Sequence, residues 1–350
     1  MKRVILLLFY TLLVYYNLHA QSLSGTVYDT HTKKPIPEVN IYLDGTSIHT
    51  VTDANGNFNL AVGKLINTQL IISHIAYEIQ IIASPFEKMP EKIYLKEQTN
   101  ILVEAVIELL FTRKQMLKAF REQFLGQTRA GKSCKILNEG DIQLTYDRDA
   151  RSLTAYCREP IIIENEYLSY KIYFGLISFQ TTYLDNSINS KNARQSAFYG
   201  TSSFVDLKPG DKKTKKRRDD IFKASAVNFF KNLSNNSLKD ADYKIFNNGY
   251  PINQNFYFII KDTLSQKLIQ IDPESNINKI AVGYNGKKVT GKITVLYNKK
   301  QQSEITFLTN KFHVDRYGNI NEIDQIFYSG YMGQQRIGHM LPLDYELPDK

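Results

Sequence analysis

Three polar residues in the segment VTDANGNFNLAV are spaced like the ligands of a calcium-binding loop. Asp53, Asn55 and Asn57 alternate, with Gly56 among them. An EF-hand loop places a glycine at its sixth position and a glutamate at its twelfth. Counted from Asp53, the glycine is fourth and the twelfth position is Lys64. The spacing therefore favours a tight turn, in which the Asp53 carboxylate accepts a backbone N–H group two residues later and the pair Asn55-Gly56 tolerates positive φ angles.

The other polar residues form no recognisable catalytic or metal-binding motif. The histidines are scattered, and none begins an H-x-x-E or H-E-x-x-H arrangement that would bind zinc. The chain contains no G-x-S-x-G nucleophile elbow and no glycine-rich phosphate loop. The spacing of Glu164 and Glu166 does not distinguish an acid–base pair from two charges at a strand end. We therefore predict no catalytic, cofactor-binding or metal-binding residue.

A basic segment, KPGDKKTKKRRDD, holds seven Lys and Arg residues in the eleven positions 208–218. One hypothesis is contact with anionic lipid headgroups, at ~1 kcal/mol per basic residue near a charged membrane. The residues predicted for this contact are Lys212, Lys213, Lys215, Lys216, Arg217 and Arg218. We favour the simpler interpretation, a solvated loop with Asp219 and Asp220 at the N-terminus of a following helix. Aromatic residues do not alternate with the basic ones, so we predict no nucleic-acid partner.

The first twenty residues have the pattern of an export signal. Lys2 and Arg3 precede an apolar run of thirteen residues, Val4–Tyr16, and Ala20 is a small residue at the expected cleavage position. A membrane-spanning helix needs ~20 apolar residues, which favours cleavage over anchoring. We expect the mature protein in the periplasm, in the outer membrane or at the cell surface. There its net charge, +9 for the whole chain, favours anionic lipid, an acidic glycan or no charged partner at all.

Residues 21–97 are predicted to form a small β-sandwich. Short segments of alternating polarity are separated by turn residues, and no helical pattern interrupts them. The expected strands cover residues 23–29, 39–44, 47–53, 57–62, 69–75, 78–84 and 91–96.

Residues 98–350 are predicted to form a larger β-rich α+β domain with two helices. The first helix covers residues 112–125, with Thr112 as its N-cap, Gly126 after its end and an apolar stripe that includes Phe120 and Phe124. The second covers residues 220–236. Expected strands cover residues 141–146, 152–157, 160–165, 167–184, 256–262, 267–272, 278–284, 292–298 and 303–310, with a strand-like bridge at 99–110. Asn285-Gly286 is a pair typical of type I′ hairpin turns.

The two cysteines are compatible with a disulfide in an exporting compartment. A turn near residues 147–152, however, places Cys157 opposite Ile142 and well away from Cys134. We therefore favour two separate thiols over a bond.

The N-terminal segment resembles a known domain. SGTVYDTHTKKPIPEVNIYLDGTSIHTVTDANGNFNL, residues 24–60, is similar to the carboxypeptidase-regulatory-like domain, a transthyretin-like β-sandwich. The resemblance rests on Gly25, Val27, Asp29, Thr32, Pro35, Val39, Gly45, Thr46, Thr52, Asp53, Gly56 and Phe58. It implies a seven-stranded sandwich with Asp53 and Gly56 in a hairpin between two strands. It implies no peptidase activity, because the domain is an accessory without catalytic residues. The domain is widespread in exported proteins of the Bacteroidetes, including N-terminal extensions of outer-membrane receptors.

The rest of the chain resembles the C-terminal part that follows this domain in a group of Bacteroidetes proteins. The segments that carry this resemblance are residues 198–238 and 312–346. It implies no particular activity.

Together these patterns predict a non-catalytic binding or assembly module of the cell envelope, with a protein or glycan partner bound through sheet edges and exposed aromatic residues. The alternative is an envelope hydrolase or glycan-processing enzyme in residues 98–350, which a pocket with converging titratable groups would favour. A third hypothesis is a protein held at an anionic membrane by its basic segment. No cofactor is expected, and the oligomeric state is left open.

Overall fold

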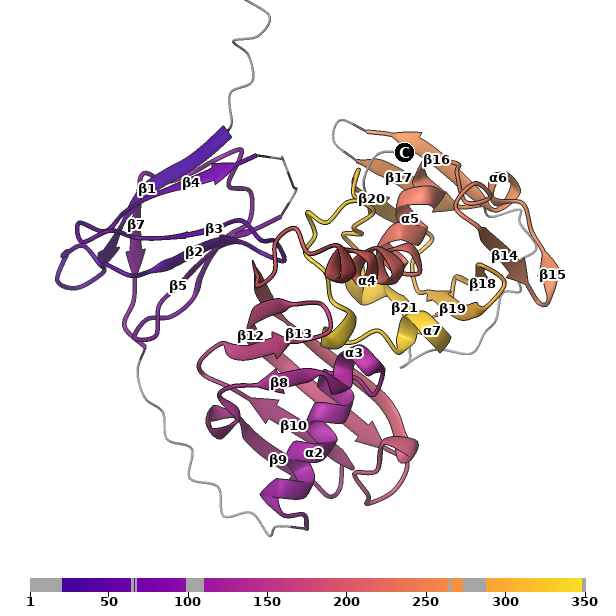
Figure 1. Cartoon of the computed structure of the whole chain (residues 1–350), viewed down its shortest axis with the longest axis horizontal. Helices are drawn as coiled ribbons and strands as arrows, with labels where there is room; N and C mark the ends of the chain where they lie inside the picture. Colours follow the sequence, from indigo (N-terminus) through magenta and orange to yellow (C-terminus); the bar gives the residue numbers. More distant parts are fainter. Residues whose placement is uncertain are drawn as a thin grey trace, which may run out of the picture. The chain divides into compact units, whose positions relative to one another are not determined.

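The computed structural model describes residues 21–63, 66, 68–98, 110–263, 266–272 and 288–347 (Figure 1). The predicted export signal, nearly all of the bridge at 99–110, the strand at 278–284 and the Asn285-Gly286 turn lie outside the described residues. The chain divides into two compact units, residues 1–104 and 105–350. In the part of the chain that is described, no helix is both long and apolar enough to cross a membrane.

The N-terminal unit is a β-sandwich of two sheets. One sheet has the order β4-β1-β7 and the other the order β3-β2-β5-β6. The strands are β1 (Gln21–Asp29), β2 (Asn40–Leu43), β3 (His49–Val51), β4 (Asn57–Val62), β5 (Leu70–Ser73), β6 (Gln80–Ile82) and β7 (Lys92–Leu95). In β4 exposed and buried residues alternate, and the buried Phe58, Leu60 and Val62 enter one core with residues of both sheets. The predicted seven-stranded β-sandwich is confirmed.

The first half of the C-terminal unit is a sheet of six strands covered by a helix. The order is β8-β11-β12-β10-β9, with β13 paired to β12. The strands are β8 (Cys134–Ile136), β9 (Gln143–Asp147), β10 (Ser152–Tyr156), β11 (Ile161–Asn165), β12 (Tyr170–Tyr183) and β13 (Ala193–Asp206). The helix, α2 (Arg113–Phe124), has the predicted Thr112 cap, and the Thr112 hydroxyl accepts the N–H of Gln115. Its buried Phe120 and Phe124 meet sheet residues edge to face, as Phe120 does with Phe179 at 4.7 Å between ring centroids.

The second half of the C-terminal unit has its own core, enclosed by two smaller sheets and a helix. The sheet orders are β15-β14-β18-β19-β21 and β16-β17-β20. The strands are β14 (Tyr243–Asn247), β15 (Tyr250–Pro251), β16 (Phe258–Asp262), β17 (Lys267–Ile271), β18 (Gly291–Tyr297), β19 (Gln301–Phe307), β20 (Lys311–Val314) and β21 (Ile326–Ser329). Phe229, Phe230 and Leu233 of α5 (Ala226–Ser234) fill the core between them. The mainly β fold that was predicted is therefore confirmed.

The second predicted helix is two helices, and the first of them begins earlier than expected. α4 spans Lys212–Lys223 and ends at Ala224, and Ser225 then caps α5 by accepting the N–H of Asn228. Three helices of a single turn, α3 (Arg129–Lys132), α6 (Gln254–Tyr257) and α7 (Gly330–Gly333), were also not predicted. The basic segment, expected as a solvated loop, is therefore helical.

The cysteines are two separate thiols in the structure. The predicted register is confirmed, since Tyr156 pairs with Gln143 and the next residue, Cys157, follows opposite Ile142. Burial raises the pKa of Cys134 to about 12 and that of Cys157 to about 11.

Candidate functional site

The Asp53 carboxylate is used by its own turn. Its Oδ1 accepts the N–H groups of Asn55 and Asn57, both at 2.8 Å, and the hydrogen bond from Asn57 is the main cause of its lowered pKa. Gly56 has a φ of 74°, and a Cβ there would lie 2.6 Å from the Val27 carbonyl oxygen. The turn connects β3 and β4, which belong to different sheets. The expected hairpin is therefore wrong, because the chain crosses from one layer of the sandwich to the other at this point.

A second turn, in the C-terminal unit, repeats the same hydrogen bonds. Asp315 Oδ1 accepts the N–H groups of Tyr317 at 2.8 Å and Asn319 at 2.9 Å, and Gly318 has a φ of 99°. Among the residues that the structure describes, no three His, Cys, Asp or Glu side chains are grouped so that they could hold a metal ion. Both aspartates stabilise turns.

The basic segment is divided by its helix into exposed and buried residues. Asp211 caps α4 by accepting the N–H of Thr214 at 2.8 Å. The side chains of Lys212, Lys213, Lys215 and Lys216 are exposed. Asp219 and Asp220 lie inside the helix and not at its N-terminus, where they were expected. Asp219 instead pairs with Lys215 at 2.9 Å, one helical turn earlier.

Arg218 and Arg217 attach α4 to the six-stranded sheet. The Arg218 guanidinium donates to both carboxylate oxygens of Asp206, at 2.7 and 2.8 Å, and to the carbonyl oxygens of Leu168 and Ser169. Its pairing lowers the pKa of Asp206. Arg217 donates to the Tyr167 carbonyl oxygen at 3.1 Å. Arg218 is 6% exposed, so it is not part of a basic surface, and the prediction for it is corrected.

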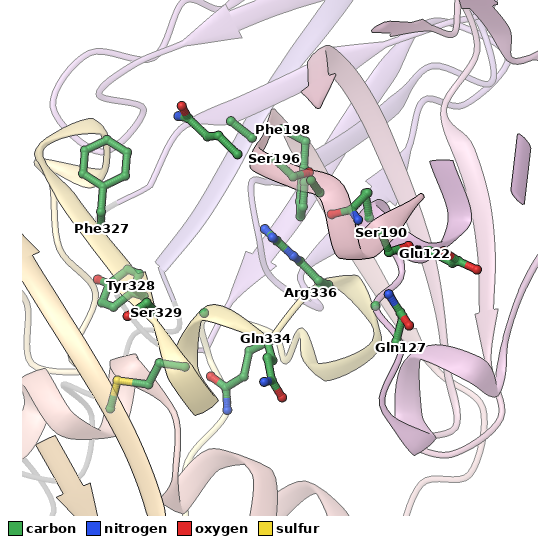
Figure 2. A pocket seen from close by; sticks show the side chains of 18 of the residues that line it. Glu122, Gln127, Ser190, Ser196, Phe198, Phe327, Tyr328, Ser329, Gln334 and Arg336 are labelled. Carbon is green, nitrogen blue, oxygen red and sulfur yellow. Dashed lines mark hydrogen bonds between the residues drawn. The ribbon is translucent and has the colours of Figure 1, made fainter. Parts of the chain in front are cut away.

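A cavity of about 1010 Å³ in the C-terminal unit is a stronger candidate for a functional site. Its wall is formed by the end of α2, by β13, by β21 and by the segment from α7 to Arg336 (Figure 2). The lining residues are Glu122, Gln123, Gly126, Gln127, Thr128, Ser190, Ala193 to Phe198, Ile323, Ile326 to Ser329 and Met332 to Arg336.

Two strands present their edges to this cavity. Side chains alternate between the two faces of a strand, so a strand with one face toward a cavity contributes every second residue. β13 instead contributes the consecutive residues 193–198, and β21 contributes 326–329. Within the described residues, β13 pairs with β12 alone and β21 with β19 alone, apart from an isolated bridge next to β21. No further strand among the described residues pairs with the outer side of either one, so both are edge strands that border the cavity.

The side chains around these edges are amides, hydroxyls and aromatic rings. Five glutamines line the cavity, at positions 123, 127, 195, 334 and 335. Phe198, Phe327 and Tyr328 supply rings, and burial raises the pKa of the Tyr328 phenol, which keeps it a neutral hydrogen-bond donor. Such a lining combines apolar contact with groups that donate and accept hydrogen bonds, as ligand sites do.

Arg336 brings a positive charge into the cavity. Figure 2 shows its side chain projecting from the segment after α7 into the space beside Ser196 and Phe198. Its Cζ lies 6.0 Å from the centroid of the Phe198 ring. Burial lowers the pKa of its guanidinium. Arginine still remains protonated, because its ordinary pKa is far above neutrality.

The backbone around Arg336 is held by close packing. The next residue, Ile337, is 1% exposed and belongs to the core under α2. Gly338 donates its N–H to the Leu125 carbonyl oxygen at 3.0 Å, and a Cβ on Gly338 would lie 2.4 Å from the Cα of Gly131. A Cβ on Gly126 would lie 3.1 Å from the Arg336 Cβ. Glycines at these positions allow the chain to bring Arg336 against the end of α2.

Glu122 is the carboxylate among the lining residues. Its Oε2 accepts a hydrogen bond from the Ser190 hydroxyl, and its Oε1 lies 4.0 Å from Lys118 Nζ. Most glycoside hydrolases use a pair of carboxyl groups on either side of the bond that they cleave. The cavity thus offers one such group and gives the hydrolase alternative no further observation in its favour.

Comparison with known proteins identifies the N-terminal unit. Residues 23–107 match the family model of the CarboxypepD_reg-like domain. The chain carries a CarboxypepD_reg-like domain. The predicted resemblance is confirmed for this part, while the C-terminal region has no assigned family. No curated protein matches the chain in sequence.

The CarboxypepD_reg-like domain contributes none of the residues that line the cavity, since these run from Glu122 to Arg336. None of the residues proposed as site residues in the sequence analysis lines it either. β13 was missed because the segment before residue 200 is polar and its burial does not alternate cleanly. The sequence nevertheless contained a signal in the segment QQRIG. Two glutamines and an arginine directly precede an isoleucine there, and such polar residues are unusual beside a residue that packs in a core.

Proposed function

We propose that this protein is an exported, non-catalytic binding module of a Bacteroidetes-like cell envelope, and that its C-terminal unit binds an extended segment of a partner protein. The observation that carries the proposal is the pair of open strand edges, on β13 and β21, that border one cavity. An extended peptide adds to such an edge through main-chain hydrogen bonds, while pockets beside the edge select its side chains.

The lining supports a peptide over a sugar. Glutamine amides and serine hydroxyls would hydrogen-bond to either ligand, and aromatic rings would contact either one. Open strand edges are complementary only to another extended backbone, because its N–H and C=O groups repeat at the same spacing. Export is supported by the predicted signal at residues 1–20 and by the occurrence of CarboxypepD_reg-like domains in exported proteins.

The test uses peptides whose backbone donors can be removed. A library of peptides of about eight residues, the length of an ordinary strand, is incubated with the mature protein, and bound members are identified by mass spectrometry. The selected peptides are then remade with N-methyl groups at alternate residues. N-methylation keeps the side chains and removes main-chain N–H donors, so we expect binding to weaken at least about tenfold, the effect of losing two or more hydrogen bonds.

Two proline variants test the strand itself. In an antiparallel pair, adjacent residues point their N–H groups alternately to the partner strand and away from it. Of Ser196→Pro and Ala197→Pro, one therefore removes a bond to β12 and lowers the melting temperature, while the other removes an N–H group at the open edge. We expect the more stable of the two variants to lose peptide binding.

Three results would contradict the proposal. They are unchanged affinity of the N-methylated peptides, full binding by the more stable proline variant, and selection of no peptide at all. In the last case, binding of oligosaccharides in a glycan array would favour the glycan ligand in its place.

A further inference from the structure

The Arg336 guanidinium lies over the Phe198 ring but has no oxygen acceptor among the side chains and carbonyl groups that the structure describes. It carries five N–H donors in a planar arrangement. No hydrogen bond or ion pair to a carboxylate, carbonyl or hydroxyl is made by these donors within the described residues, and burial alone accounts for its lowered pKa. A partly buried charge without a partner is costly. Its position in the cavity of Figure 2 therefore needs an explanation.

Three other arginines, the buried Arg218 and the exposed Arg113 and Arg121, each donate to an oxygen acceptor. Arg218 donates to Asp206 and to two carbonyl oxygens. Arg113 donates to the Ile142 carbonyl oxygen at 2.7 Å, and Arg121 pairs with Glu139. Arg336 differs from all three.

The neighbouring residue adds a second unpaired donor. The Gln335 side-chain nitrogen Nε2 is buried and has no hydrogen-bond partner. A buried donor left without an acceptor costs about 1–3 kcal/mol. Two consecutive residues of the cavity wall thus carry N–H groups that lack acceptors, although the Gln335 nitrogen is covered by protein atoms and only the Arg336 guanidinium projects into the cavity.

The acid in the cavity does not neutralise Arg336. The Glu122 carboxylate accepts a hydrogen bond from the Ser190 hydroxyl. Glu122 and Arg336, which both line the cavity, form no ion pair within 4.0 Å. Figure 2 shows the Glu122 carboxylate and the Arg336 guanidinium directed toward opposite sides. The positive charge is therefore available to a ligand.

We propose that Arg336 binds a carboxylate of the extended peptide. A guanidinium matches a carboxylate with two parallel hydrogen bonds, a geometry that lysine does not reproduce. The carboxylate belongs either to the C-terminus of the peptide or to an Asp or Glu side chain. This inference rests on the proposed function, because it assumes that a peptide occupies the cavity.

The test compares peptides that differ only in their carboxylates. Three libraries of peptides of about eight residues are used, one with acidic side chains and an amidated C-terminus, one with a free C-terminus and no acidic residue, and one with neither carboxylate. Each is incubated with the full mature chain and with the variants Arg336→Gln and Arg336→Lys. Arg148→Gln is the matched control, since Arg148 is an exposed arginine in the turn between β9 and β10 and does not line the cavity.

We expect the wild type to prefer at least one carboxylate library over the neutral one by about tenfold or more, as for hydrogen bonds to charged groups. Arg336→Gln should lose this preference, Arg336→Lys should keep only part of it, and Arg148→Gln should keep all of it. The library that is preferred identifies the source of the carboxylate. The melting temperatures of the variants establish that each is folded.

The outcomes separate this inference from the proposed function. Equal binding of all three libraries, or a preference that survives in folded Arg336→Gln, would overturn the carboxylate inference and leave peptide binding in place. No binding of any library would overturn both.

Discussion

At the scale of single residues, aspartates close to a glycine determine turns by purely local chemistry. Asp53 and Asp315 each accept the N–H groups two and four residues later, with a glycine of positive φ between them. Because every partner lies within five residues, the sequence was sufficient to predict the turn at Asp53, and the same local pattern recurs at Asp315. The residues of the cavity are different, since Arg336 meets Phe198 and Gly126 only through the fold.

A third aspartate, Asp29, makes the N-terminal unit sensitive to acid. Its Oδ1 accepts hydrogen bonds from the Thr32 N–H at 2.6 Å and the His31 N–H at 2.8 Å, and the bond from Thr32 is the main cause that lowers its pKa to about 2. A lowered folded-state pKa contributes stability above the unfolded-state value, about 3.9 for Asp. That stability is lost as the pH falls from about 4 toward 2.

We therefore expect Asp29→Asn to remove part of the acid sensitivity of the N-terminal unit. The measurement is the free energy of unfolding in urea at a series of pH values from about 5 to 2, for the wild type and the variant. In this window the unfolding free energy of the wild type should fall more steeply with decreasing pH than that of the variant. The difference in slope should correspond to the uptake of up to one additional proton on unfolding. Parallel curves would show that the Asp29 carboxylate has the same pKa in the folded and unfolded chains.

At the scale of elements, prediction was most direct where one face of an element is buried along its whole length. β4, β7 and α2 have this regular pattern, whereas β3 and β6, which contain no buried residue, were predicted from short alternating segments between turn residues. β13 and β21 lie at sheet edges beside a polar cavity, so their side chains carry a weaker pattern. The helix α4 was interpreted as a loop because its charges suggested a solvated segment. Its Asp211 cap and its lysines and arginines, which favour helix, indicated the alternative.

The attachment of α4 to the sheet can be tested at Arg218. Arg218→Met leaves Asp206 and two carbonyl oxygens without their donor. Loss of one partner of a buried ion pair costs 3–5 kcal/mol, and partial exposure of Asp206 reduces this to about 2–3 kcal/mol. Lys213→Met, at an exposed position of the same helix, should change stability by less than about 0.5 kcal/mol.

Urea unfolding of both variants measures this difference. An Arg218→Met variant as stable as Lys213→Met would mean that α4 is held by its apolar residues alone.

The same two variants also test the hypothesis of contact with an anionic membrane. Of the two residues, Lys213 is exposed and Arg218 is buried, so only Lys213 could contact lipid headgroups. If liposomes with anionic headgroups bind the protein through this surface, Lys213→Met should weaken binding, and added salt should weaken it further.

At the scale of the whole molecule, the two compact units have separate hydrophobic cores. The sandwich core is formed by residues between Leu23 and Leu95, and the two cores of the C-terminal unit contain none of them. A domain with its own core can in principle fold alone. Both sheets of the sandwich are complete within residues 21–98, including the pairing of β1 with the last strand, β7.

We therefore expect residues 21–98 to fold without the rest of the chain. A sandwich of this size buries a smaller fraction of its surface than a larger domain, so its unfolding free energy should lie near the lower end of the usual 5–15 kcal/mol. Expressed alone, it should show a β-type circular dichroism spectrum and one cooperative urea transition, which should coincide with one transition of the full chain. A fragment without cooperative unfolding would mean that the sandwich depends on residues beyond 98. The peptide assays would then have to be interpreted for a single cooperative molecule, because a change in the cavity would also change the stability of the CarboxypepD_reg-like domain.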